Sequence, residues 1–325
     1  MSRQKNLKRN LLICLLAGSA VMYTLPLHAA TSVVANNALP QGGQFFNGKE
    51  FVAGSVIDNN KQQFTGIDGN VIGSIAMPND LTMNVHQANQ NAVIKWGSFD
   101  VGGSATVNFT SDKTNFNTLN YVNSGSASQI YGTINGLGGN IYVVNTAGVQ
   151  IGPSAQINVG SLYVSNNVLD DSVFNNFVAN ADNANFDLGG KPTTYTDAAL
   201  MSLGNINANN VTFEGNGRIV IDSERIKNVA GNEVNNNFEV HTNDAGNVLI
   251  GYDAYVETDK DNDGLVDGYK GQDKTFSNNV YVNGKLDNTV KGYMWVEDVE
   301  QLQAINTNLG GNYALRNSID ATGTA

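Results

Sequence analysis

The sequence contains little cysteine, charge or proline. Its single cysteine is Cys14, and it has five prolines in 325 residues. Charged residues make up 14% of the chain, below the usual share of about a quarter. A lone thiol excludes an internal disulfide, and the steady recurrence of apolar residues does not fit a disordered chain. The sequence therefore predicts an ordinary hydrophobic core under a surface made polar by uncharged side chains, above all asparagine.

The common catalytic motifs are also missing. The chain has no G-x-S-x-G, H-E-x-x-H or P-loop sequence, and its only histidines beyond the first thirty residues are His86 and His241. We therefore expect no enzymatic activity. The alternative is a secreted β-helix polysaccharide lyase, which would gather carboxylates and basic groups on one face of the fold. Its candidate residues here are Glu214, Arg218, Asp222, Glu224 and Arg225.

Residues 1–30 have the pattern of a secretory signal peptide. Four basic residues precede the apolar run 11–20, and small residues at 29–30 provide a cleavage site. The run is about half the length that a membrane-spanning helix needs, roughly 20 residues. Cleavage would remove Cys14. The mature chain would then contain no thiol, which suits a chain that crosses a membrane unfolded, because a premature crosslink would block its passage.

The mature chain is strongly acidic. Without residues 1–30 it has 14 Lys and Arg against 29 Asp and Glu, a formal net charge of −15. Such a surface disfavours nucleic acid and anionic membranes as partners. It favours solubility, cation binding and attraction to basic surfaces.

The stretch 129–165 indicates the fold. Runs of three to five residues rich in Val, Ile and Tyr alternate with Gly, Asn and Ser, a pattern typical of short strands joined by turns. Ile141 and Leu162 lie about twenty residues apart, which suits one coil of a parallel β-solenoid. The abundance of asparagine predicts stacked asparagine ladders at the solenoid turns.

The same stretch resembles the N-terminal secretion domain of large exoproteins exported by two-partner secretion, the filamentous-haemagglutinin group. The family usually has Pro-Asn where this chain has Thr146 and Ala147. An upstream block, 91–102, is similar to the family's Asn-Trp-x-Ser-Phe-x-Ile-Gly motif. The segments that carry the main resemblance are 129–132, 138–144, 145–148, 149–152 and 155–162.

The resemblance implies an all-β, right-handed parallel β-helix with an N-terminal cap and extra-helical hairpins. It also implies a role as the export-signal domain of an adhesin-like or haemagglutinin-like exoprotein. A partner outer-membrane transporter of a Gram-negative bacterium would recognise this domain through its periplasmic domains, and the chain would then fold at the cell surface. A contact-dependent growth-inhibition toxin would share the domain, and further partners would be glycans or proteins of host or bacterial cells. The implied recognition site is the turn formed by Asn145, Thr146, Ala147 and Gly148.

From the residues alone, the same turn is a tight connection with Gly148 at positive φ. Both interpretations can hold together, because a misfolded turn would also prevent export.

The chain divides into five expected regions. The stretch 169–201 interrupts the strand pattern and predicts a short helix or hairpin laid on the solenoid. Apolar residues at intervals of three across 296–308 predict a helix. The last region has no evident solenoid cap, and we interpret it as a truncated passenger from a longer gene. The regions are the signal peptide 1–30, the cap 31–80, the β-helix 81–250, an acidic segment 251–290 and the start of a passenger 291–325.

The acidic segment contains a calcium-loop pattern. Carboxylates at alternating positions, a glycine at the sixth position and an aspartate at the ninth match the ligand spacing for a hard cation. Lys270 stands where an EF-hand has its bidentate glutamate. The sequence thus predicts a solitary Ca²⁺ loop, with a solvated acidic turn as the alternative. The expected ligands are Asp259, Asp261, Asp263, the backbone carbonyl of Leu265, and Asp267.

Overall fold

A computed structural model describes the chain at residues 22–23, 34–58, 60–180, 188–195, 197–230, 238–256, 268–269 and 274–320. The chain forms two compact units. The larger unit comprises 33–248 with 278–287, and the smaller comprises 1–32, 249–277 and 288–325.

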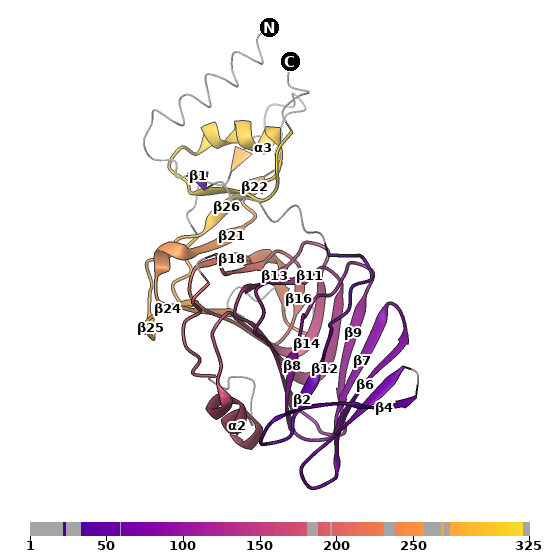
Figure 1. Ribbon diagram of the computed structural model, residues 1–325. Helices are drawn as coiled ribbons and strands as arrows, with labels where there is room; N and C mark the ends of the chain where they lie inside the picture. Colours follow the sequence, from indigo (N-terminus) through magenta and orange to yellow (C-terminus); the bar gives the residue numbers. More distant parts are fainter. Residues whose placement is uncertain are drawn as a thin grey trace. The chain divides into compact units, whose positions relative to one another are not determined.

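The larger unit is a parallel β-solenoid in which each coil contributes a strand to three sheets (Figure 1). The first sheet stacks β7 (Thr82–Gln87), β9 (Thr106–Ser111), the start of β12 (Thr133–Asn145), the start of β14 (Gln156–Ser165), β16 (Asn205–Asn207) and β19 (Ile226–Lys227). The second sheet stacks β8 (Asn91–Trp96), β10 (Phe116–Val122), the ends of β12 and β14, β17 (Asn210–Glu214), β20 (Phe238–Thr242) and β24 (Val280–Val282). The third sheet stacks β11 (Ser128–Ile130), β13 (Gly148–Ile151), β15 (Ala199–Ser202) and β18 (Arg218–Asp222).

The register confirms the predicted coil. Ile141 pairs with Leu162 of the next coil, and Thr118 of the preceding coil pairs with Ile141. Inward side chains of successive coils are therefore stacked, and Ile134, Ile141 and Ile157 are almost completely buried. Because one face of each strand packs on the coil below it, the alternating pattern of the sequence is sufficient to build this all-β core.

Antiparallel strands precede the solenoid and cover its first edges. The strand β6 pairs with β7, the edge of the first sheet, and β2 pairs with β8, the edge of the second. Covering these edges protects the sheets from pairing with other chains. These strands are β2 (Gln44–Phe46), β3 (Phe51–Ala53), β4 (Ser55–Asp58), β5 (Lys61–Thr65) and β6 (Val71–Asn79).

A continuous ladder of asparagine amides follows the first sheet. Each asparagine after the first donates from Nδ2 to Oδ1 of the asparagine one coil earlier, at 2.8 to 3.0 Å. A ladder at the turns, as the sequence predicts, is formed where the first sheet bends into the second: Asn117 donates to Asn91, and Asn140 donates to Asn117, each at 2.8 Å. The longer ladder lies instead on outward strand positions of the first sheet, because alternation directs every second residue of a strand away from the core. Its members are Asn84, Asn108, Asn135, Asn158 and Asn207.

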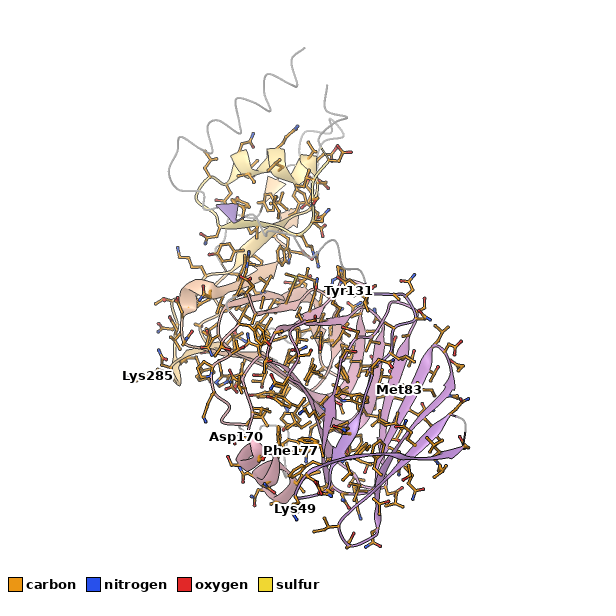
Figure 2. The ribbon with its side chains drawn as sticks, in the orientation of Figure 1. Lys49, Met83, Tyr131, Asp170, Phe177 and Lys285 are labelled. Carbon is orange, nitrogen blue, oxygen red and sulfur yellow. The ribbon has the colours of Figure 1, made fainter. Side chains whose placement is uncertain are left out.

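The excursion predicted at 169–201 is present and contains α2 (Asp171–Asn180). Asp170 begins the helix by accepting hydrogen bonds at Oδ1 from the backbone N–H groups of Ser172 and Val173. Figure 2 shows Phe177 on this helix. Its side chain is fully buried against the outer face of the second sheet and meets Tyr142 edge-on at a centroid distance of 5.1 Å. The early coils of the second sheet are therefore buried on both faces.

The smaller unit also contains parallel strands. The strands β21, β26 and β27 pair side by side, and β1 pairs with β27. Trp295 and Tyr313 are fully buried in its core. The helix predicted within 296–308 is present, and Asp298 caps it by accepting from the N–H of Gln301 at 2.8 Å. The elements are β1 (Met22–Tyr23), β21 (Val248–Tyr252), β22 (Tyr255–Val256), β23 (Gly268–Tyr269), β26 (Tyr293–Val296), α3 (Val299–Ala304), η3 (Ile305–Thr307) and β27 (Tyr313–Leu315).

The remaining helices and strands of the described residues are short: η1 (Ser223–Arg225), η2 (Ala245–Asn247) and β25 (Lys285–Leu286). In the part of the chain covered by this description, no helix is long and apolar enough to span a membrane.

Candidate functional site

The turn 145–148 forms the corner between the second and third sheets. It joins β12, which ends at Asn145, to β13, which begins at Gly148. Residues 122–128 of the preceding coil and residue 193 of the excursion supply its hydrogen-bond partners. The corner is thus enclosed by the coil before it and by the excursion after it.

Asn145 holds this corner with its side-chain amide. Its Nδ2 donates to the backbone oxygen of Ser126 and to Oγ of Ser128, each at 3.0 Å. Its Oδ1 accepts from the N–H of Ala147 at 3.0 Å, which closes an Asx turn. The residue is only 1% exposed, so its polar atoms are bonded within the protein rather than presented to solvent.

Thr146 is also enclosed. Its N–H donates to the carbonyl of Val122 at 3.2 Å, and its carbonyl accepts from Oγ1 of Thr193 at 2.6 Å. The second bond ties the excursion to the corner. Of the four residues, only Ala147 is partly exposed.

Gly148 has the positive φ that the sequence predicts, at +111°. A Cβ atom built there would lie 2.5 Å from the carbonyl oxygen of Ala199 on the next coil. Both the backbone conformation and the close approach of β15 therefore require glycine at this position.

The predicted calcium ligands Asp259, Asp261, Asp263, Leu265 and Asp267 lie outside the described residues. Among the residues that are described, no group of three or more His, Cys, Asp or Glu is placed to hold a metal ion.

The five charged residues of the lyase alternative are divided between the second sheet, the third sheet and the short helix η1, which contains Glu224 and Arg225. Asp222 is fully buried at the end of β18, where it accepts from the N–H of Glu224 at 3.2 Å and pairs with Arg225 at 3.6 Å. Arg218 begins the same strand of the third sheet. Glu214 instead ends β17 of the second sheet. The structure therefore does not gather the five into one group.

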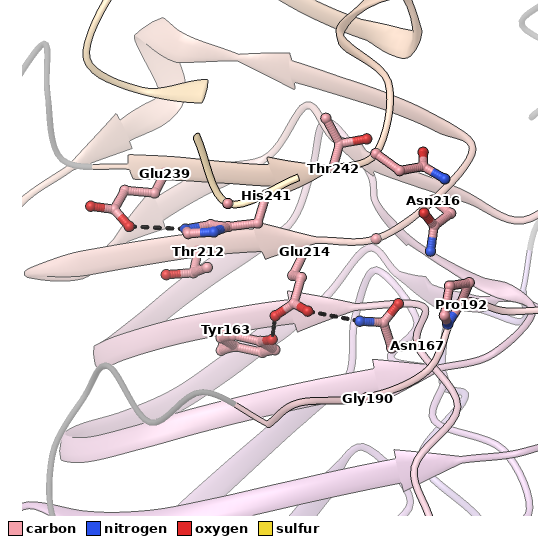
Figure 3. Close-up of a pocket in the computed structure, with 13 residues that line it drawn as sticks. Tyr163, Asn167, Gly190, Pro192, Thr212, Glu214, Asn216, Glu239, His241 and Thr242 are labelled. Carbon is pink, nitrogen blue, oxygen red and sulfur yellow. Dashed lines mark hydrogen bonds and ion pairs between the residues drawn. The ribbon is translucent and has the colours of Figure 1, made fainter. Parts of the chain in front are cut away.

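Glu214 lies in a cleft that the sequence analysis did not identify (Figure 3). Its carboxylate accepts from Tyr163 Oη and, at 2.8 Å, from Nδ2 of Asn167. Burial raises the pKa of the Glu214 carboxyl, and the neighbouring charge of His241 opposes that rise. The sequence signal for this cleft is a set of polar residues at outward positions of stacked strands. Tyr163 and Glu214 are separated by the excursion in the sequence, so the sequence alone does not show that they lie on neighbouring coils.

Comparison with known proteins identifies the class. Residues 70–292 match the family model of the TPS secretion domain, where TPS stands for two-partner secretion. The match covers more than half of the chain. The chain therefore belongs to the family of TPS secretion domains, and it carries the export domain of a two-partner-secreted exoprotein.

Individual relatives come from Haemophilus influenzae. Two versions of a heme/hemopexin-binding protein, one from strain KW20 / Rd, are each 35% identical over 88 residues. The matched part is 27% of this chain but only 10% and 9% of those proteins, so the match spans about a tenth of their length. The crystal structure of the HMW1 secretion domain is 18% identical with a TM-score of 0.35, covering 60% of this chain and 42% of that one.

Proposed function

We propose that the chain is exported through its partner outer-membrane transporter by means of the segment around residues 145–148. The enclosure of this corner carries the proposal. In the folded coil the side chains of Asn145 and Thr146 are buried. A transporter would therefore contact them only before the coil folds. Recognition by the periplasmic domains of the transporter would thus precede folding, and each new coil would then fold onto the last at the cell surface.

Secretion tests this proposal. The full chain is expressed with and without its transporter, and the medium is assayed for wild type and Asn145→Ala. We expect transporter-dependent release that the substitution abolishes. The matched control is Asn135→Ala, which removes a half-buried ladder amide away from the corner.

Folding and recognition are separated by a second measurement. Both variants are refolded and compared by circular dichroism and thermal unfolding. If Asn145→Ala refolds like Asn135→Ala but alone fails to be secreted, the corner acts in recognition. Release that does not need a transporter, or equal secretion of the two variants, would contradict the proposal.

The remaining assignments extend the same proposal. Residues 1–30 would direct the chain to the periplasm as a cleaved signal peptide, and the exported domain would act without catalysis. Residues 291–325 would begin a passenger that contacts glycans or proteins on host or bacterial cells. The loop of Asp259, Asp261, Asp263, Leu265 and Asp267 would bind Ca²⁺ outside the cell, where the calcium concentration suits a weak site.

A further inference from the structure

The outer face of the second sheet changes character along the solenoid. On the early coils it is covered by α2 and the residues around it, including Leu169 and Leu188. Beyond Tyr163 the same face borders a cleft of about 410 Å³. That volume falls within the usual range of ligand pockets, roughly 300–1,000 Å³.

Two columns of outward side chains form the floor of this cleft. In one column Tyr163, Thr212 and Glu239 are in register on successive coils. In the other, Glu214 is followed by His241. Thr212 is small, so it leaves a hollow between the larger side chains of Tyr163 and Glu239.

The first carboxylate, Glu214, is desolvated and held in place. Tyr163 and Asn167 donate to its two oxygens, and burial raises its pKa. Neither donor carries a positive charge, and the nearby His241 compensates the carboxylate only in part.

The second carboxylate, Glu239, lies on the adjacent strand. Its Oε2 is 3.0 Å from Nε2 of His241. The His241 ring stacks on Tyr281 at a centroid distance of 4.8 Å with an angle of 8° between the planes. Figure 3 shows Glu214 and Glu239 on either side of Thr212.

Asn167 in the wall of the cleft provides an independent observation. The residue is 5% exposed, and its Oδ1 has no hydrogen-bond partner within the protein. Its Nδ2 is engaged by Glu214, which fixes the orientation of the amide. A buried acceptor without a donor is costly, so a partner seated in the cleft would stabilise it.

We propose that this cleft binds an organic cation, with an ammonium or guanidinium group seated over Thr212 between Glu214 and Glu239. Of the described residues that line the cleft, none is lysine or arginine, so His241 is the only side chain among them that could carry a competing positive charge. The N–H groups of the ligand would form charge-assisted hydrogen bonds with the carboxylates. Asn167 lies on the other side of Glu214 from Thr212 (Figure 3), so a second donor farther along an elongated ligand would satisfy its Oδ1. The aromatic ring of Tyr163 would add cation–π attraction.

The same geometry disfavours other ligands. An anion would meet two carboxylates and find no lysine or arginine among the described lining residues. A bare metal ion would need at least three converging ligands, and no such group exists among the described residues. An elongated organic cation, such as a basic side chain of a peptide, fits both the charge and the open shape of the cleft.

Calorimetry with argininamide as the probe tests the proposal on the full mature chain. We expect saturable binding that weakens with added salt. We expect Glu239→Gln to weaken it by about tenfold or more, since a charge-assisted bond is lost. Thr212→Tyr should abolish binding by filling the hollow without changing any charge. The control Glu50→Gln removes the same charge at an exposed position outside the cleft.

Three results would overturn the proposal. The first is no saturable binding of argininamide. The second is equal weakening by Glu239→Gln and Glu50→Gln, which would show a general attraction to an acidic protein. The third is binding of an uncharged sugar, such as N-acetylglucosamine, in place of the cation. A thermal unfolding curve for each variant confirms that the protein tested is folded.

Discussion

Asn135 donates from its side-chain Nδ2 to Oδ1 of Asn108, 3.0 Å away, although the two are separated by a full coil of chain. Asn158 donates to Asn135 in the same way. Asn135→Ala breaks both bonds, and we expect it to lower the free energy of unfolding by about 1–3 kcal/mol. Denaturant unfolding measures the change.

Asn84→Ala is the matched control for the ladder. Asn84 is its first member and only accepts, so the substitution breaks one bond, and we expect about half the loss. Equal losses for the two variants would show that the amides do not act through these bonds.

Gly148→Ala tests the corner between the second and third sheets. The backbone has φ +111°, and the added methyl group would lie 2.5 Å from the carbonyl of Ala199. Gly138→Ala is a control with φ +86° and no atom within 4 Å of the added group. We expect about 1–3 kcal/mol of backbone strain in both variants and a larger loss only for Gly148→Ala. Similar losses of unfolding free energy in the two variants would mean that β15 shifts to make room for the methyl group.

Phe177→Ala tests whether the excursion is an integral part of the fold. Its side chain is fully buried between α2 and the second sheet. Its truncation should lower the free energy of unfolding by about 3–5 kcal/mol, because it leaves a cavity. Asn176→Ala changes an exposed neighbour and should have little effect. Limited proteolysis of the excursion shows whether the loss is local or global.

The stability should depend on pH through Glu214. Burial raises the pKa of the folded-state carboxyl above its ordinary value of 4.5, so the folded protein binds this proton more tightly than the unfolded chain does. The resulting stabilisation is complete below pH 4.5 and is lost as the pH rises through the folded-state pKa. Wild type should therefore lose stability relative to Glu214→Gln over that interval.

Thermal unfolding at a series of pH values measures this difference. Glu50→Gln, which removes an exposed glutamate, sets the baseline for the loss of one charge. A Glu214→Gln curve parallel to wild type at every pH would rule out a contribution from the cleft carboxylate.

Calcium removal tests the acidic loop. We expect Ca²⁺ to raise the melting temperature of the mature chain at millimolar concentration and a chelator to reverse the effect. Asp261→Asn should weaken the response, whereas Asp112→Asn, which removes an exposed carboxylate elsewhere, should leave it intact. An equal response in both variants would indicate general screening of the acidic chain.

The coil was predictable because it is determined by residues that are close together in the sequence. Alternation and turn residues in 129–165 determine the strands, and the spacing of Ile141 and Leu162 determines their stacking. The excursion was predictable because it interrupts that pattern. The positive φ of Gly148 was also predictable from the sequence, since a tight turn requires it at that position.

The cleft was not predictable from the sequence. Tyr163 and Thr212 become neighbours only because the intervening excursion loops out of the coil. The length of such an insertion does not show which residues pair between the strands before and after it, because the residue at which the coil resumes is not evident from the sequence. The ladder of Asn91, Asn117 and Asn140 at the turns was predictable, but the longer ladder on the strands of the first sheet was not, for a related reason. Composition shows that asparagine is abundant but does not show which face of a strand each one occupies.

The asparagine ladder also has an electrical polarity. Every amide in it donates toward the start of the chain, so the amide dipoles are aligned, with their oxygen ends directed toward later coils. The last amide is Asn207, and the position in register with it on the next coil is Lys227. A positive charge thus lies in register with the negative end of a row of parallel dipoles, as basic residues do at the C-terminal ends of helices. The row gives this face of the solenoid a built-in field along its axis.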